Sequence, residues 1–571
     1  MKNQAISDES KATVKDLLCL TLTWCLVVAI VNPVGNFPLN DDWSFGLAVQ
    51  YFMQVGHFHP TGWTTMTLLT NVLWGTLFCL PEGFSFTALR FSTLTASWLG
   101  VLGTYWLVRK LDRPRSIALL AAFILAFNPL YFVSSNTFMT DVPCVTLMIF
   151  SAVFFLEYLK SEAMPALITG TLFSLAAILS RQVGLAVPMA FSLVLICARG
   201  FKARVLLSAL APVLLGIIVL ASFQFWLKIS GNWPAHLTID SRELCDTVKG
   251  TLRHPVVAFP KMFHIGYVGL VSIGLFLSPL LLLTGPGIGR STKKGLAVAA
   301  VVFLALAVLL AFYQHAGTAF MLAPLGNYLS LSGLGILSLT DALFVLLNPL
   351  PTLPRGVCWA AMLIGMVGGS LLICRTSCIL RRLFSRPAIP MKWDYEAQAG
   401  AFLLLITVIY LGPTIFGKLF DRYLIPIIPF LAGFLVLFLP PDALRFKSMR
   451  YGLIMSILLA FSLFSVFGTR DYLAWNRTRW EALDDLMSKE QAKPQSIDGG
   501  VEFNGFYLFN DGFKMRPGKS PWWVVDDRYL ITFNPLPGYR ILHDYHYTHW
   551  MPPYQGNIYV LQRDSDGSPQ Q

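Results

Sequence analysis

The sequence predicts a polytopic α-helical membrane protein with a small soluble α+β domain at its C-terminus. The chain has 571 residues, of which 55% are hydrophobic and only 13% are charged. A soluble protein of this length needs more charge than that to cover its surface. Apolar runs of about eighteen residues recur along most of the chain, and each is long enough to cross a bilayer core of about 30 Å.

The basic residues predict how the chain crosses the membrane. They cluster around 109–115, 199–204, 290–294, 375–392 and 445–450, and the positive-inside rule places these clusters in the cytoplasm. The net charge of +12 therefore suits anionic lipid head groups and does not indicate a nucleic-acid partner.

The apolar runs between the clusters amount to about thirteen spans, with the N-terminus inside and the C-terminus outside. A further apolar segment, 331–347, is interpreted as re-entrant or interfacial, because a crossing there would move a basic cluster outside. The predicted spans are 17–34, 86–107, 117–133, 142–158, 166–179, 184–197, 205–227, 263–283, 297–312, 357–373, 401–415, 424–439 and 453–467.

The composition changes after Phe467 and becomes polar and rich in aromatic residues. We therefore divide the chain into a transmembrane domain, 1–467, with a first outer loop at 35–85, and a soluble outer domain, 468–571. Within the soluble domain a helix is expected over 480–487. Short strands, broken by Asn, Gly and Pro, are expected over 501–509, 522–533, 539–546 and 557–561.

Two adjacent carboxylates, Asp41 and Asp42, follow the first predicted span. Carboxylates near a membrane surface cost free energy to keep dry, so they normally lie in water or in a polar cavity. One interpretation is a general base, with or without metal binding. The other is helix capping, because an amphipathic surface helix is expected from these residues to about Gly56. The two roles are compatible.

A second candidate acid, Asp141, lies in a very short outer turn before a predicted span. Pro143 fits the first turn of the helix that follows, so Asp141 also has a capping interpretation. The short turn nevertheless keeps this carboxylate at the membrane surface, on the same predicted side as Asp41 and Asp42. Two acids on one face of a bundle suggest a catalytic arrangement.

Cationic candidates come from two places on that side. Arg181 ends the fifth predicted span, and Lys418, Arg422 and Tyr423 lie in a turn before a late span. Guanidinium and ammonium groups beside a phenol make a suitable clamp for a phosphate. Anchoring at the membrane interface is the alternative for each of them.

Two histidines of the first outer loop, His57 and His59, are candidate substrate contacts, and a simple surface loop is the alternative. The loop cysteines Cys79 and Cys245 leave a disulfide open. The spacing of the nine cysteines does not match a zinc site.

These motifs resemble those of the GT-C superfamily of membrane glycosyltransferases. The matching pieces are the acidic motif of the first outer loop, Asp41-Asp42, the Met-Thr-Asp-Val-Pro turn around Asp141, and the Asp-Arg-Tyr-Leu-Ile-Pro turn around Arg422. The resemblance is strongest to glycosyltransferase family 39 and its relatives, the branch of protein O-mannosyltransferases and lipid A aminoarabinose transferases. It covers the chain from about Leu17 to Phe467.

The resemblance implies an inverting transferase that moves a sugar from a polyprenyl-phosphate donor to a lipid, glycan or protein acceptor. Asp41 or Asp42 and Asp141 would be the catalytic acids. Arg422 and Tyr423 match the late turn of the family, and Arg181 is a weaker match. It also implies a bacterial inner membrane location. The first motif is Asp-Asp-Trp-Ser-Phe here, which differs from that of the lipid A enzymes and argues against lipid A as acceptor.

No cofactor is required by this chemistry. A divalent cation, Mg or Mn, held by Asp41, Asp42 and Asp141 is an option that the sequence leaves open. Two other functions predict different patterns. A transporter or flippase would place ionisable residues near the middle of the membrane and show paired halves. A polymerase or ligase of lipid-linked glycans would centre on arginines and a large outer loop.

Overall fold

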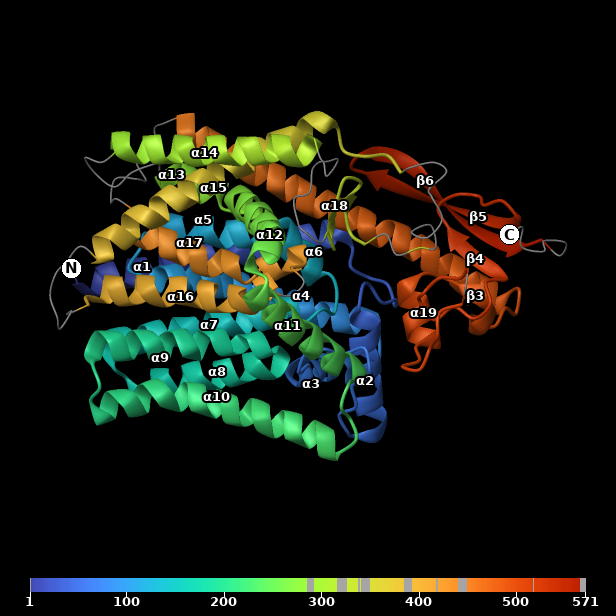
Figure 1. The fold of residues 1–571 in the computed structure, drawn as a ribbon, viewed down its shortest axis with the longest axis horizontal. Coiled ribbons are helices and arrows are strands. Elements are labelled where there is room, and N and C mark those ends of the chain that lie inside the picture. The colour runs from blue at the N-terminus through green and yellow to red at the C-terminus, as the bar shows by residue number, and fades with distance from the viewer. Residues whose placement is uncertain are drawn as a thin grey trace.

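A computed structural model describes residues 2–284, 292–315, 326–336, 339, 350–384, 393–416, 419–439, 449–516 and 518–564. The long helices lie side by side in a bundle, and a small sheet lies at one end of it (Figure 1). The principal membrane helices are α1 (Lys2–Val31), α4 (Phe86–Lys110), α5 (Arg115–Ala126), α6 (Pro129–Ser135), α7 (Asp141–Ser161), α8 (Met164–Ser180), α9 (Ala186–Arg199), α10 (Ala203–Ile229), α12 (Pro255–Phe276), α13 (Ser278–Thr284), α14 (Thr292–His315), α15 (Arg355–Phe384), α16 (Tyr395–Phe416), α17 (Ile427–Leu437) and α18 (Met449–Ser488).

The prediction of a polytopic helical protein is confirmed. In the described part of the chain, nine helices are long and apolar enough to cross a membrane, or up to ten if the bent pair α5 and α6 is one span. A helix or a pair of helices lies at each of the predicted spans. The number of about thirteen and the orientation of the termini stay predictions. The apolar segment 331–347 lies largely outside the described residues.

Local sequence explains how these helices start and pack. Asn128 caps α6 after a 64° bend, with its side-chain oxygen accepting from the backbone N–H groups of Leu130 and Tyr131. Helices α12 and α15 cross closely at glycines. A Cβ on Gly274 would lie only 2.2 Å from the backbone nitrogen of Gly369. Small residues at such a crossing allow two membrane helices to approach.

The first outer loop folds into α2 (Asp42–Val55) and α3 (Leu69–Cys79) at the end of the bundle nearest the sheet (Figure 1). A helix thus lies where the surface helix was expected, and it ends at Gly56, which has a φ of 75°. The buried guanidinium of Arg90 on α4 anchors the chain before α2 by donating to the carbonyls of Pro33 and Phe37. Helix α11 (Ala235–Arg253) covers the same end.

The C-terminal part is an α+β unit, as predicted, but its elements differ in detail. Helix α18 runs through the expected boundary at Phe467 without a break, so the last membrane helix and the expected helix at 480–487 are one element. A sheet follows in the order β3-β4-β6-β5, with β3 parallel to β4 and the other pairs antiparallel. Its strands are β3 (Ile497–Asp498), β4 (Tyr529–Thr532), β5 (Tyr539–Trp550) and β6 (Pro553–Arg563).

One predicted strand is wrong, because residues 501–508 form the helix α19 (Val501–Leu508). A short apolar run of this length has no periodicity that separates a strand from a buried helix. Gly500, with a φ of 90°, turns the chain into this helix. On the buried face of α19, Gly505 lies against the indole of Trp43 in the first outer loop, and a Cβ there would approach that ring to 2.4 Å.

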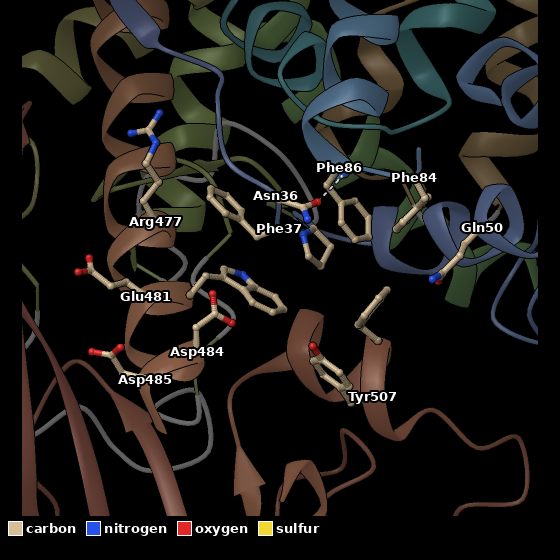
Figure 2. Close-up of a pocket in the computed structure, with 13 residues that line it drawn as sticks. Asn36, Phe37, Gln50, Phe84, Phe86, Arg477, Glu481, Asp484, Asp485 and Tyr507 are labelled. Atoms are coloured by element: carbon tan, nitrogen blue, oxygen red, sulfur yellow. Dashed lines mark hydrogen bonds between the residues drawn. The ribbon is translucent and has the colours of Figure 1, made fainter. Parts of the chain in front are cut away.

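The first outer loop and the C-terminal part meet through aromatic side chains. Trp43 lies 5.3 Å from Phe509 and 5.4 Å from Trp523, measured between ring centroids. The two parts also enclose a cavity of about 580 Å³ between α18, α19 and the start of the first outer loop (Figure 2). The C-terminal unit is therefore docked on the loop that carries the acidic motif.

Candidate active site

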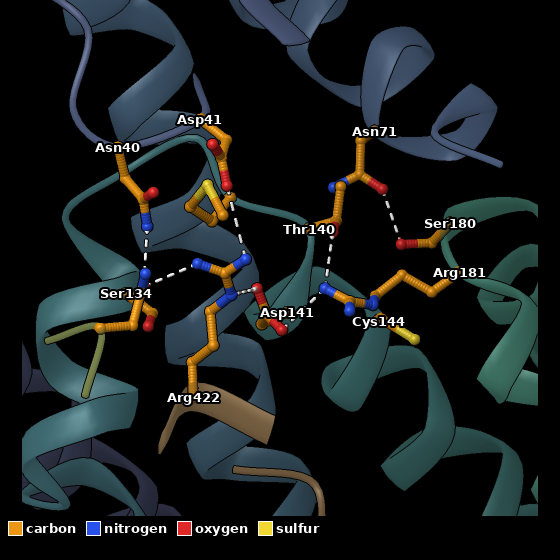
Figure 3. Close-up of polar contacts among 12 residues, drawn as sticks. Asn40, Asp41, Asn71, Ser134, Thr140, Asp141, Cys144, Ser180, Arg181 and Arg422 are labelled. Atoms are coloured by element: carbon orange, nitrogen blue, oxygen red, sulfur yellow. Dashed lines mark hydrogen bonds and ion pairs between the residues drawn. The ribbon is translucent and has the colours of Figure 1, made fainter. Parts of the chain in front are cut away.

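Asp141 lies at the centre of the polar cluster that the fold creates (Figure 3). It is the first residue of α7 and is buried, with its side chain 2% exposed. Its Oδ1 lies 2.7 Å from Nη1 of Arg181, and its Oδ2 lies 3.6 Å from Nε of Arg422. The N-cap position of α7 belongs to Thr140, and Asp141 follows it inside the helix. Ion pairing, not capping, is therefore what this carboxylate does in the free protein.

Asp41 approaches the cluster from the first outer loop. Its Oδ2 accepts from Nη2 of Arg422 at 3.4 Å, and its Oδ1 accepts from Nε1 of Trp63 at 3.0 Å. The residue occupies the N-cap position of α2, but its side chain does not cap that helix. The Asp41 side chain is 27% exposed against 2% for Asp141. Of the two acids, Asp41 is the one that a substrate can reach.

The phenol ring of Tyr423 supports both guanidinium groups. The Cζ atom of Arg181 lies 5.1 Å from the ring centroid, and the Cζ atom of Arg422 lies 5.5 Å from it. Cation–π contacts of this kind hold guanidinium groups in place without using their N–H donors. Within the described part of the chain, Arg181 donates from Nη1 to Thr140 and Asp141, so Nε and Nη2 are left for another partner.

Sequence reasoning missed Asn40, which joins several segments of the site. Its backbone has a φ of 60°, a left-handed conformation that asparagine tolerates better than most residues. Its side-chain amide donates to Oδ1 of Asn327 and to the phenol of Tyr328. Asn327 Oδ1 also accepts from Nη1 of Arg422 at 2.6 Å. The Asn-Asp pair before a helix was the only signal in the sequence, since the partners are far away along the chain.

Two further acids hold the surroundings of Asp41 in place. Asp421 accepts the backbone N–H groups of Asn327, Tyr328 and Leu329 with Oδ2, and burial raises the pKa of this carboxyl. Glu502 on α19 accepts the backbone N–H of Asn40 at 3.0 Å. The C-terminal part thus contacts the residue that precedes Asp41, a link that the sequence did not predict.

Asp42, the other member of the predicted catalytic pair, lies apart from the cluster and bonds to backbone N–H groups. Its Oδ1 accepts the N–H of Leu39 at 2.5 Å, and its Oδ2 accepts the N–H of Phe138 at 3.0 Å. Burial raises the pKa of Asp42 to about 7, while these two bonds and the charge of Arg90 oppose the rise. The side chain is 1% exposed and ties the first outer loop to the turn before α7. We assign Asp42 a structural role.

The remaining candidates do not join the cluster. His59 is exposed, and its Nδ1 pairs with Oδ1 of Asn232 at 2.6 Å, while its ring lies 4.9 Å from that of Tyr51. His57 is also exposed, beyond the far end of α2, roughly 20 Å along the helix from Asp41. Lys418 lies outside the described residues. Cys79 and Cys245 are both free thiols.

The predicted metal ligands Asp41, Asp42 and Asp141 do not come together. Across the part of the chain that the structure describes, no group of three or more His, Cys, Asp or Glu side chains is placed to hold a metal ion. Asp42 is occupied by backbone donors, and the other two acids face guanidinium groups. The arginines occupy the positions where a cation would lie, so the residues present do not fit a metal held by all three acids.

Comparison with known proteins supports the class suggested by the motifs. Residues 68–227 match the family model described as dolichyl-phosphate-mannose-protein mannosyltransferase. This segment contains Asp141 and Arg181. No curated protein sequence matches the chain.

Solved structures with a similar arrangement include ArnT from Cupriavidus metallidurans bound to undecaprenyl phosphate, with a TM-score of 0.40 and 12% identity over 97% of this chain and 99% of that one. The apo form of the oligosaccharyltransferase from Archaeoglobus fulgidus gives a TM-score of 0.39 and 13% identity over 83% of this chain and 58% of that one.

The chain is a multi-pass helical membrane protein. Its residues 68–227 match a mannosyltransferase family model, in agreement with the GT-C resemblance of the sequence motifs.

Proposed function

We propose that this protein transfers a sugar from a polyprenyl-phosphate donor to an acceptor hydroxyl, with inversion at the anomeric carbon. The observation that carries the proposal is the cluster of two acids and two guanidinium groups at one end of the bundle. The description of the matching family names dolichyl-phosphate-mannose, which is a polyprenyl-phosphate sugar. A prenyl tail can lie in lipid beside the bundle while its phosphate meets cations at the level of the head groups.

Asp41 would act as the general base. It is the more exposed acid, and Trp63 and Arg422 fix the direction of its carboxylate. The acceptor oxygen attacks the anomeric carbon as its proton passes to Asp41, and the bond from that carbon to the phosphate oxygen breaks. A positioned base contributes about 100- to 10,000-fold to such a step.

Arg181 and Arg422 would bind the donor phosphate. The polyprenyl phosphate leaves with the bonding electrons, so negative charge grows on its oxygens, and guanidinium donors aimed there stabilise the transition state. Asp141 contacts both arginines and would hold them at a fixed separation. Tyr423 supports the same pair from the ring face.

We also propose a location in the bacterial inner membrane, with the N-terminus in the cytoplasm and the acid cluster and C-terminal part on the outer side. The basic clusters between the spans support this orientation. The sugar and the acceptor stay open. A divalent cation is not required, because the two guanidinium groups can supply positive charge to the leaving phosphate.

The test is transfer from polyprenyl-phosphate sugars by purified protein in detergent with a membrane extract as acceptor source. We expect product with the wild type, and a loss of at least 100-fold in Asp41→Asn and Asp141→Asn. Asp544→Asn, which changes an exposed carboxylate on β5, is the matched control and should stay active. Undiminished transfer by Asp41→Asn would contradict the assignment of the base.

A lipid-linked glycan polymerase or ligase, or a transporter, is the alternative. Mass spectrometry of the copurified lipid separates the transporter from the enzymes: a polyprenyl phosphate supports a transferase, polymerase or ligase, and a bound solute without such a lipid supports a transporter.

A further inference from the structure

The cavity between α18 and α19 is separate from the acid cluster but close to it along the chain. Its volume of about 580 Å³ is within the range of small-ligand pockets, ~300–1,000 Å³. Part of its wall is Asn36, Phe37 and Pro38, which lead directly into Asn40 and Asp41. A molecule in this cavity would therefore lie beside the segment that presents the candidate base.

One wall of the cavity is aromatic. Its rings come from the first outer loop, from the start of α4, from α18 and from α19, and they are Phe37, Phe84, Phe86, Trp480, Phe506 and Tyr507. Several of them pack on one another, with 6.4 Å between the ring centroids of Phe37 and Trp480 and 5.7 Å between those of Phe86 and Phe506. The wall is thus built jointly by the membrane part and the C-terminal part.

Carboxylates from α18 form another wall. Glu481 and Asp485 are four residues apart and lie on one side of the helix, whereas Asp484 lies on the other side, toward Tyr507 (Figure 2). Asp485 accepts from the phenol of Tyr545 and pairs with Lys489. The contacts among the described residues leave the exposed carboxylates of Glu481 and Asp484 available to a ligand.

Lys489 pairs with Asp485, but among the described residues no salt bridge reaches the carboxylates of Glu481 and Asp484. The guanidinium of Arg477 also lines the cavity, but it donates to the backbone carbonyls of Asn32 and Val34, which fixes it at the side. A phosphate or another anion is therefore disfavoured by the carboxylates. A ligand that offers several hydroxyl donors on its edge and an apolar face matches both walls, because carboxylates accept charge-assisted hydrogen bonds and flat rings bury apolar area.

We propose that this cavity binds a sugar ring of the acceptor. The inference rests on the proposed function and adds a substrate class to it: the acceptor would be a carbohydrate or carry one. Sugar hydroxyls would donate to Glu481 and Asp484, and a C–H face would pack on Phe506 and Tyr507. Pro38, in the wall of the cavity, is three residues before Asp41 along the chain.

Binding can be tested separately from transfer. The full-length protein in detergent is applied to a glycan array of neutral, acidic and amino-sugar oligosaccharides. We expect the wild type to bind a subset of them and Glu481→Gln/Asp484→Asn to give at least tenfold lower signal on the same spots. Tyr507→Ala, which removes one aromatic face, should weaken the signal too. Glu490→Gln/Asp544→Asn changes two exposed carboxylates outside the cavity and is the matched control.

The exposed positions of Glu481, Asp484 and Tyr507 make folded variants the expected result, and a thermal melt verifies it. The proposal is overturned if no glycan binds, if the cavity variants bind like the wild type, or if only the cation spermine competes for the site. Asp41→Asn should bind glycans normally. Lost transfer with retained binding in this variant supports both Asp41 as the base and the cavity as the acceptor site. If the protein binds glycans but transfers no sugar, the bound glycan is not an acceptor, and the acceptor proposal is wrong.

Discussion

The Nε atom of Arg422 and the Oδ2 atom of Asp141 lie 3.6 Å apart, and both are buried without a hydrogen-bond partner among the described residues. Buried polar atoms in native structures are normally paired, and each exception calls for an explanation. Here a donor and an acceptor attract each other electrostatically while their hydrogen-bonding capacity is unused. The proposed donor phosphate would accept from this Nε–H, which explains why the arginine is not fully bonded by the protein.

Replacement of Arg422 by lysine tests the need for the guanidinium shape. Arg422 contacts Asn327 with Nη1 and Asp41 with Nη2, and one ammonium group cannot reproduce that planar fork. We expect kcat for sugar transfer to fall by roughly 100-fold or more although the charge is kept. Arg540→Lys, on the exposed surface of β5, is the control. Near-normal kcat in Arg422→Lys would mean that only the charge matters.

Replacement of Trp63 by phenylalanine removes one hydrogen bond to the candidate base. The indole Nε1–H donates to Asp41, and phenylalanine keeps an aromatic ring without the donor. A hydrogen bond to a charged group is worth about 1.5–3 kcal/mol, so kcat should fall roughly 10- to 100-fold. Trp522→Phe changes a neighbouring ring, 6.1 Å from Trp63 between centroids, and should cost much less. An equal fall of kcat in the two variants would show that aromatic packing, and not the hydrogen bond to Asp41, causes the loss.

Replacement of Glu502 by glutamine tests whether the C-terminal part supports the acid loop. Glu502 pairs with Arg479 at 3.0 Å, both side chains are 0% exposed, and Glu502 also accepts from the N–H of Asn40. Breaking a buried pair typically costs about 3–5 kcal/mol. We expect a clear fall in Tm together with a fall in kcat. Glu490→Gln, at an exposed carboxylate of the same part, should change neither Tm nor kcat. An unchanged Tm in Glu502→Gln would show that this ion pair does not stabilise the acid loop.

The stability of the protein should depend on pH through Asp42. Burial raises the pKa of this carboxyl to about 7 in the folded chain, against about 3.9 in an unfolded one. Its contribution to stability is therefore fully present below about pH 4 and is lost as the pH rises through about 7. Asp42→Asn cannot titrate, so the Tm of the wild type relative to this variant should fall between pH 5 and pH 8. A difference that stays constant over that range would show that Asp42 is ionised throughout.

The sequence by itself determined the class of fold and most of the candidate site. Long apolar runs can bury their backbone in a bilayer only as helices, so each run predicted a helix wherever it lay in the bundle. Asp141, Arg181, Arg422 and Tyr423 could be picked out because polar residues at the ends of such runs are few. Their convergence follows from chain topology, which the basic clusters predicted.

Only the tertiary structure decided between Asp41 and Asp42. Successive residues at the start of a helix differ in direction by about 100°, so one carboxylate faces Arg422 while the other bonds to the turn before α7. The sequence also did not predict that residues 501–508 form a helix, or that Asn40 and Glu502 contact each other. The decisive contacts join residues from 96 to 462 positions apart, and local pattern carries no information about such a partner.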